Sequence, residues 1–260
     1  MKEYVVDNLN NKMRYHDFPG EDTPIIFIHG LGCAGSFDYP EVAAQTDLIN
    51  HRRILVDLLG SGFSDKPEAF PYTVKAHADY LFEFVQELKL DKVIIFGHSL
   101  GGPVAIELAH KCRDIVEAII LSESNLDKSK PGAPTYEFGS YEEEDFVNSI
   151  YDEVVIENSR KNSMWAATLS VWSPEAVSRI SKSAIAGGIP SWREVLYSLK
   201  CSRTFIFGEE SLPDDDKNEL DKQGINIEIV KDAGHSMAWE NPKGLAEAIG
   251  KGIIYSRKNA

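Results

Sequence analysis

The sequence predicts an α/β fold with a mostly parallel, eight-stranded sheet, helices on both of its faces and an inserted helical cap. Nearly continuous apolar runs recur along the chain, for example at residues 25–28, 93–96 and 118–121. Such runs are typical of parallel strands that are buried on both faces. Helical patterns lie between them, as at residues 76–88, and this alternation indicates a parallel sheet.

The strands are expected in the following order along the chain. Residues 5–6 lie in a first strand and residues 12–17 form its hairpin partner. Later strands are expected at residues 25–28, 53–56, 93–96, 118–121, 204–207 and 225–230. Core helices are expected at residues 76–88, 102–111 and 243–254.

One segment interrupts the alternation of strands and helices. Residues 125–199 contain no strong strand pattern and carry three of the four tryptophans. A Pro/Gly-rich loop is followed by helical patterns at residues 142–160, 163–171, 174–186 and 191–199. We interpret 125–199 as a helical cap inserted into a core made of residues 1–124 and 200–260. The alternative is the helical half of an α+β domain.

Composition limits the class of protein and its partners. The 260 residues are 43% hydrophobic and 26% charged, which is typical of a soluble globular protein. The net charge of −14 disfavours nucleic acid and anionic membrane surfaces, so a small-molecule substrate is expected. The acidic runs 142–145 and 214–216 are interpreted as solvated helix starts. The oligomeric state is left open.

Cysteine usage and the N-terminal residues bear on location. Cys33, Cys112 and Cys201 are few, odd in number and without Cys-x-x-Cys spacing, so neither a disulfide framework nor a zinc site is predicted. The first eight residues have no apolar core of signal-peptide length, and no run approaches the length of a membrane span. We expect a cytoplasmic protein.

The motif Gly97-His98-Ser99-Leu100-Gly101 carries the strongest functional signal. It lies between the strand expected at 93–96 and the helix that begins near Gly102. This context matters because Gly-x-Ser-x-Gly alone occurs by chance. A strand–turn–helix of this kind holds the serine in a strained conformation above the sheet edge, and a Cβ at the flanking glycines would clash. Ser99 is therefore the candidate nucleophile.

With this motif the chain resembles the α/β-hydrolase family from residue 12 to residue 254. Four motifs carry the resemblance, each after an expected strand: His29-Gly30-Leu31-Gly32, Asp57 to Ser64, Gly97 to Gly101, and Gly234-His235-Ser236-Met237. The resemblance implies the order nucleophile, acid, histidine. A serine at position 99 disfavours the branch of the family that uses an aspartate nucleophile on haloalkanes and epoxides.

A serine hydroxyl needs a base within hydrogen-bond reach, and His235 is the best candidate. It follows the last expected strand and fits the family order. His98 is expected to point away from the base, and His29 to brace the oxyanion loop. The remaining histidines match no motif and are expected to be solvated or to lie at helix ends: His16, His51, His77 and His110.

A tetrahedral oxyanion needs two N–H donors. The backbone N–H of Leu100 follows the nucleophile directly and is the first candidate. The resemblance implies the N–H of Leu31 as the second. Cys33 lies in the same loop and is interpreted as a neutral, packed thiol.

The acid of the triad has several candidates in the sequence. Many relatives place an aspartate after the seventh strand, where this chain has Ser211. Others carry the acid after the sixth strand, where this chain has Glu123, and we predict Glu123. The alternatives after the seventh strand are Glu209, Glu210 and Asp214. Asp57 is expected to brace a turn.

These residues predict a serine hydrolase that needs no cofactor and no metal. Neither a dinucleotide-binding turn nor a P-loop pattern is present in the sequence. The expected reaction is cleavage of a small or medium carboxylic ester through an acyl-enzyme. The alternatives are C–C bond hydrolysis, lyase or perhydrolase chemistry with the same triad, or a ligand-binding receptor on this scaffold, because a fold does not set its chemistry.

Overall fold

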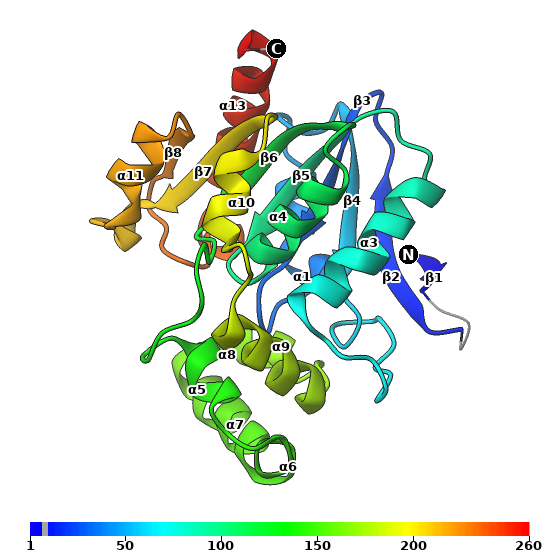
Figure 1. Cartoon of the computed structure of the whole chain (residues 1–260), viewed down its shortest axis with the longest axis vertical. Coiled ribbons are helices and arrows are strands. Elements are labelled where there is room, and N and C mark those ends of the chain that lie inside the picture. Colours follow the sequence, from blue (N-terminus) through cyan, green and yellow to red (C-terminus); the bar gives the residue numbers. More distant parts are fainter. Residues whose placement is uncertain (7–9, 260) are drawn as a thin grey trace.

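A computed structural model describes residues 1–6 and 10–259 of the chain. Over these residues, eight strands form one sheet in the order β1-β2-β4-β3-β5-β6-β7-β8 (Figure 1). The strands are β1 (Lys2–Val5), β2 (Lys12–Phe18), β3 (Asp22–Ile28), β4 (His51–Asp57), β5 (Val93–His98), β6 (Val116–Ser122), β7 (Ser202–Gly208) and β8 (Asn226–Val230). β2 is antiparallel to β1 and β4, and the other neighbours are parallel, as predicted.

The parallel strands bring their carboxyl ends to one edge of the sheet. In the register of β5 and β6, His98 lies opposite Ser122, and Ser122 in turn lies opposite Ile206 of β7. The residues that follow these strands therefore emerge at the same level. In open α/β sheets this edge is where ligands bind.

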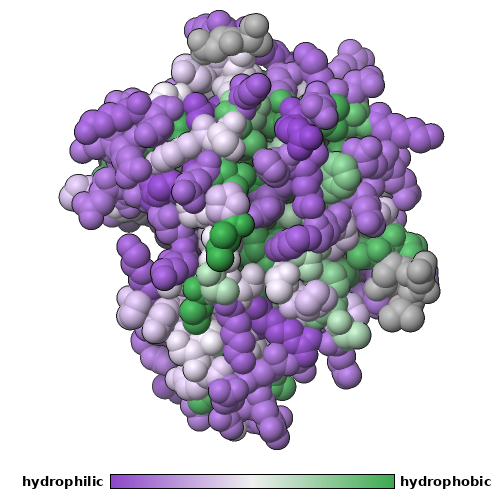
Figure 2. Space-filling view, in the orientation of Figure 1, coloured by the Kyte–Doolittle hydropathy of each residue, from purple (hydrophilic) through white to green (hydrophobic). Residues whose placement is uncertain are grey.

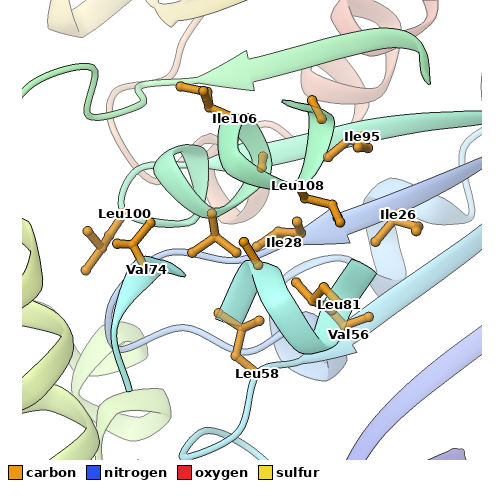
Figure 3. Packing of buried hydrophobic residues seen from close by; sticks show 14 of the residues in the cluster. Ile26, Ile28, Val56, Leu58, Val74, Leu81, Ile95, Leu100, Ile106 and Leu108 are labelled. Atoms are coloured by element: carbon orange, nitrogen blue, oxygen red, sulfur yellow. The ribbon is translucent and has the colours of Figure 1, made fainter. Parts of the chain in front are cut away.

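The hydrophobic core lies on both faces of the sheet because successive strand residues point to opposite sides. On β3, Ile26 and Ile28 belong to one buried cluster, and Ile25 and Phe27 belong to the other. Figure 3 shows the first cluster, where Ile26, Ile28 and Ile95 of the sheet meet Leu81 of the helix over it.

Helices cover the two faces as the sequence predicts. The first face is covered by α3 (Val74–Glu87) and α4 (Gly101–Lys111). The second is covered by α2 (Pro40–Ala43) and α13 (Pro242–Asn259), with the short helices α1 (Gly35–Asp38) and α12 (Met237–Glu240) at the site edge. α11 (Asp216–Lys222) packs beside β8. Both acidic runs lie at helix starts, as expected.

A group of helices between β6 and β7 forms a separate layer at the end of the molecule (Figure 1). It consists of α5 (Pro134–Gly139), α6 (Glu143–Asp145), a π-helical segment (Phe146–Ile150), α7 (Tyr151–Lys161), α8 (Ser163–Leu169) and α9 (Pro174–Ala186). We call this group the cap. Figure 2 shows a mostly hydrophilic face with hydrophobic residues gathered between the sheet and the cap.

α10 (Trp192–Ser198) falls inside the segment 125–199 but packs against α4 of the core. Its Arg193 N–H donates to the Leu126 carbonyl over 2.8 Å, so the two ends of the insertion are joined to each other. Residues 7–9 and 260 of the predicted core segments lie outside the described residues. Among the described helices, none combines the length and the apolar character that crossing a membrane requires.

Candidate active site

Ser99 occupies a strained turn between β5 and α4. Its φ is +49°, in the left-handed region that side chains other than glycine rarely adopt. A Cβ at Gly97 would lie 2.6 Å from the Cβ of Ala105, and one at Gly101 would lie 2.3 Å from the His29 carbonyl oxygen. Larger residues would therefore push the strand and helix apart. The strained turn that the motif predicts is confirmed.

His235 lies in the loop between β8 and α12 and faces Ser99. Its Nε2 is 3.1 Å from Ser99 Oγ, which is hydrogen-bond distance. Its side chain is 57% exposed, so water and substrate can reach it. The structure thus brings together the predicted nucleophile and its predicted base, 136 residues apart in the sequence.

His98 does not point away from the base, and that expectation is wrong. Its ring centroid is 4.9 Å from that of His235, because the end of β5 and the loop after β8 lie at the same edge of the sheet. Burial lowers the pKa of His98 to about 3, and the neighbouring His235 acts in the same sense. His98 is therefore a neutral neighbour, held by the Ser122 carbonyl and hydroxyl at 3.1 and 3.0 Å.

Glu123 follows β6 directly and lies beside His235. Its Oε2 is 3.8 Å from His235 Nδ1, and its Oε1 accepts the Gly208 N–H over 2.8 Å. The Oε2 contact is longer than a hydrogen bond, as is common at catalytic sites without substrate. Glu123 has φ +45°, so its backbone is strained like that of Ser99. Strain of this kind is concentrated at functional sites.

Two of the alternative acids after β7 accept backbone hydrogen bonds away from the His235 ring. Glu209 Oε2 accepts the Asp232 N–H over 3.3 Å, and Asp214 Oδ1 accepts the Asp216 N–H over 2.8 Å. The Glu210 side chain lies beside Gly234. Among these candidates, within the described residues, Glu123 makes the contact with the His235 ring. The geometry therefore favours Glu123.

The oxyanion loop, residues 29–34, lies against Ser99. A Cβ at Gly30 would be 3.0 Å from the Cβ of Ser99. No described residue accepts a hydrogen bond from the N–H of Leu31 or of Leu100. Within the described residues, both predicted donors therefore lack an acceptor, and their role as an oxyanion hole stays a prediction.

His29 orients the Leu31 N–H. The Leu58 N–H donates to His29 Nε2 over 3.1 Å, so the ring proton is on Nδ1, which donates to the Gly30 carbonyl over 2.9 Å. Burial lowers the pKa of His29, which keeps the ring neutral. The Gly30 carbonyl and the Leu31 N–H belong to one peptide plane and point in opposite directions. The bracing role expected for His29 is present.

Two tryptophans of the cap segment also hold this loop. Trp165 Nε1 donates to the Leu31 carbonyl over 2.9 Å, and Trp172 Nε1 donates to the Cys33 carbonyl over 2.7 Å. The sequence shows the tryptophans but not these contacts, which no local pattern predicts. Burial raises the pKa of Cys33, consistent with a packed thiol.

Other assignments from sequence have mixed outcomes. Asp57 braces its turn by accepting the Ser36 N–H over 2.8 Å and the Phe63 N–H over 2.9 Å, as expected. His51 and His77 are buried rather than solvated, which corrects the expectation for them. The reason is packing: His77 lies among the aromatic rings of Phe70 and neighbouring residues.

Comparisons with known proteins agree with this fold. A sequence model of the alpha/beta hydrolase fold family matches residues 23–155. An esterase from Thermogutta terrifontis, solved with malate bound, has a TM-score of 0.80 at 20% identity. The superposition covers 98% of this chain and 99% of the esterase.

Curated relatives match over a shorter part of the chain. Haloalkane dehalogenase 2 of Mycobacterium tuberculosis is 32% identical over 119 residues, which is 45% of this chain and 40% of the relative. The 2-hydroxy-6-oxo-2,4-heptadienoate hydrolase of Pseudomonas putida is 30% identical over 106 residues, 39% of this chain and 38% of the relative. The match thus spans about two fifths of the length of these relatives. On its family match and its whole-chain fold, the protein belongs to the α/β-hydrolase fold family.

Proposed function

We propose that this protein is a serine hydrolase that cleaves a small or medium carboxylic ester through an acyl-enzyme. The hydrogen bond between Ser99 Oγ and His235 Nε2, on a strained strand–helix turn, carries the proposal. The compared relatives are named for different reactions, so the choice of an ester rests on this pair and on the oxyanion loop beside it. A serine nucleophile with a histidine base is suited to acyl transfer.

The proposed mechanism begins when Ser99 Oγ attacks the ester carbonyl carbon and His235 Nε2 takes the hydroxyl proton. The N–H groups of Leu31 and Leu100 stabilise the oxyanion. Glu123 orients the His235 ring and stabilises the imidazolium. His235 then donates its proton to the departing alkoxide, and the alcohol leaves.

Deacylation repeats these steps with water. His235 takes a proton from a water molecule, whose oxygen attacks the acyl carbon. The second oxyanion collapses, Ser99 recovers its proton from His235, and the carboxylic acid leaves. The exposed position of His235 admits this water.

The surroundings of the site favour a neutral ester with an apolar group. Exposed acidic side chains surround the histidine loop, namely Glu209, Glu210, Asp214, Asp232 and Glu240. They add to the net charge of −14, which repels anionic substrates. On the cap side, the rings of Trp165 and Phe138 stack with centroids 6.4 Å apart, next to the oxyanion loop.

The test is covalent labelling by a fluorophosphonate, read by intact mass. Wild type should gain one adduct, Ser99→Ala none, and His235→Ala should react on the order of 10³-fold more slowly. Ser170→Ala is the matched control, because this exposed serine at the end of α8 lies away from the elbow. It should label like wild type. A folded wild-type protein that forms no adduct would refute the proposal.

Turnover of p-nitrophenyl esters then tests the substrate class. A neutral butyrate ester should be hydrolysed faster than one that carries a free carboxylate on its acyl chain. The difference should shrink at high salt because screening weakens the repulsion by the acidic side chains.

A further inference from the structure

A small cavity lies behind the catalytic pair, where three segments of the site meet. Its volume is about 20 Å³. Cys33 belongs to the oxyanion loop, His98 to the nucleophile turn, and Ser236 follows His235; all three line the cavity. We call it the junction cavity. A substitution that alters the shape of this cavity would therefore affect all three segments of the site.

Three buried polar atoms without partners belong to residues that line the junction cavity. They are Asp38 Oδ1, Tyr39 OH and Trp239 Nε1, and no described residue makes a hydrogen bond with any of them. Asp38 is 4% exposed and Tyr39 is 1% exposed. Leaving one such atom unsatisfied costs about 1–3 kcal/mol, so three around one cavity require an explanation.

The three atoms lie close to one another but are not bonded directly. The pKa of Tyr39 is raised by burial and then by the nearby Asp38 charge. The Cys33 thiol and the Trp239 indole both lie within reach of the Asp38 carboxyl and act to lower its pKa, yet Asp38 Oδ1 and Trp239 Nε1 each lack a partner at hydrogen-bond geometry. Asp38 is otherwise held by its other oxygen, which accepts the Ala34 N–H over 3.1 Å. An intervening molecule would satisfy all three atoms at once.

The chemistry of the three groups matches a single water molecule. The indole N–H only donates, a carboxyl oxygen accepts, and a phenol can do either. Buried waters typically make about three hydrogen bonds and need a polar cavity of about 10–15 Å³ or more. The junction cavity satisfies both conditions.

We propose that the junction cavity binds one water molecule, which bridges Asp38, Tyr39 and Trp239 and thereby ties the oxyanion loop to the histidine loop. These three side chains are then positioning residues for His235, a role that rests on the proposed serine-hydrolase function. Asp38 and Tyr39 follow the oxyanion loop, and Trp239 lies in α12, which begins two residues after His235. The water fixes the distance between these segments.

Stability measurements test the water site independently of catalysis. Tyr39→Phe and Trp239→Phe each remove one unpartnered polar group. If no water binds, Tyr39→Phe leaves the protein as stable or more stable, because the ring stays in place. Trp239→Phe also loses part of its ring, so its destabilisation is interpreted only through the double variant. If a water bridges them, each variant should raise the unfolding equilibrium constant about 5-fold.

The double variant and a control sharpen this test. Once the water is lost, the second substitution has less to remove, so the double variant should raise the constant by well under the roughly 25-fold product. Ser178→Ala is the control, because this hydroxyl is also buried and unpartnered within the described residues but lies in α9 of the cap. It should not destabilise. Single variants at or above wild-type stability, or an additive double variant, would overturn the proposal.

A crystal structure tests for the water directly, and steady-state kinetics test the positioning role. A crystal structure at about 1.5 Å resolution should show one water between the three atoms, and an empty cavity there would overturn the proposal. Trp239→Phe should lower kcat about 5- to 10-fold with little change in KM, since a displaced His235 impairs proton transfer more than binding. An unchanged kcat would overturn the positioning role. If no ester is turned over and Ser99 does not label, the proposed function fails, while the stability result still decides the water site.

Discussion

Replacing Trp165 with phenylalanine removes one hydrogen bond to the oxyanion loop and keeps an aromatic ring in the cap. The indole N–H donates to the Leu31 carbonyl over 2.9 Å. The N–H of the same Leu31 is a proposed oxyanion donor. Without the indole, the Leu31 carbonyl loses its partner and the loop can rotate toward another conformation. The donor geometry should then be less well preorganised in the transition state.

The expected fall in kcat follows from the loss of this one hydrogen bond. Leu31 is 8% exposed, so water replaces the indole poorly. Leaving a buried carbonyl unsatisfied costs about 1–3 kcal/mol, and loss of a whole oxyanion donor lowers kcat about 10²- to 10³-fold. Trp165→Phe should lie below that limit because the Leu31 N–H is kept. We expect kcat to fall about 5- to 20-fold.

The assay is steady-state hydrolysis of a neutral p-nitrophenyl ester, with kcat and KM determined separately. KM should change little, since the oxyanion forms only in the transition state. Trp192→Phe is the matched control, because Trp192 is a buried tryptophan in α10 beside Gly188. A kcat for Trp165→Phe equal to that of Trp192→Phe would refute the reasoning.

Three other outcomes are expected. Glu123→Gln should lower kcat on the order of 10³-fold with wild-type stability, whereas Glu210→Gln should change it less than about 3-fold; the reverse ranking in ester turnover would assign the acid to Glu210. Burial raises the pKa of Asp38 from 3.8 to about 7, so the folded protein favours the neutral carboxyl group. The stability of the protein that depends on this group is therefore fully present below pH 4 and is lost as the pH rises through 7. In urea unfolding, the free energy of unfolding of Asp38→Asn should therefore exceed that of wild type by up to about 4 kcal/mol at pH 8 and by almost nothing at pH 4. Asp17→Asn should show the opposite sign at pH 8, because the Arg52 and Lys2 hydrogen bonds outweigh burial and lower the pKa of Asp17; a shared sign would contradict this account. Gly32→Ala should lower kcat like Trp165→Phe, because a Cβ there would clash with the indole ring and the φ of +72° disfavours a side chain; an unchanged kcat would show that the indole contact is unimportant.

Local patterns were enough to predict most of the fold. Apolar runs marked six of the eight strands of the described chain within a few residues, although the last two residues of β5 and the early residues of β3, β6 and β7 extend beyond them; the hairpin partner expected at 12–17 is β2, one residue longer. The first strand was placed at 5–6, but β1 ends at Val5. The helical pattern expected at 174–186 matches α9 (Pro174–Ala186), because a proline in the first turn costs the helix little.

The site was predictable only where the signal was local. The turn at Ser99 depends on glycines two residues away, so the motif was sufficient. The choice between Glu123 and Glu210 depends on which carboxylate the register of β6 and β7 brings to the His235 ring. The position of His98 depends on the same sheet edge, and the sequence-based expectation for its ring was wrong.

The sequence by itself determined the strand and helix pattern, the strained serine turn and the histidine that follows the last strand. Only the tertiary structure decided that α10 packs on the core, that a cap indole holds a loop 134 residues earlier, and that three unpartnered polar groups surround one cavity behind His235. The physical reason is the sequence separation over which each interaction acts. Periodicity and turn geometry act over a few residues, whereas these contacts form between segments that packing of the whole chain brings together.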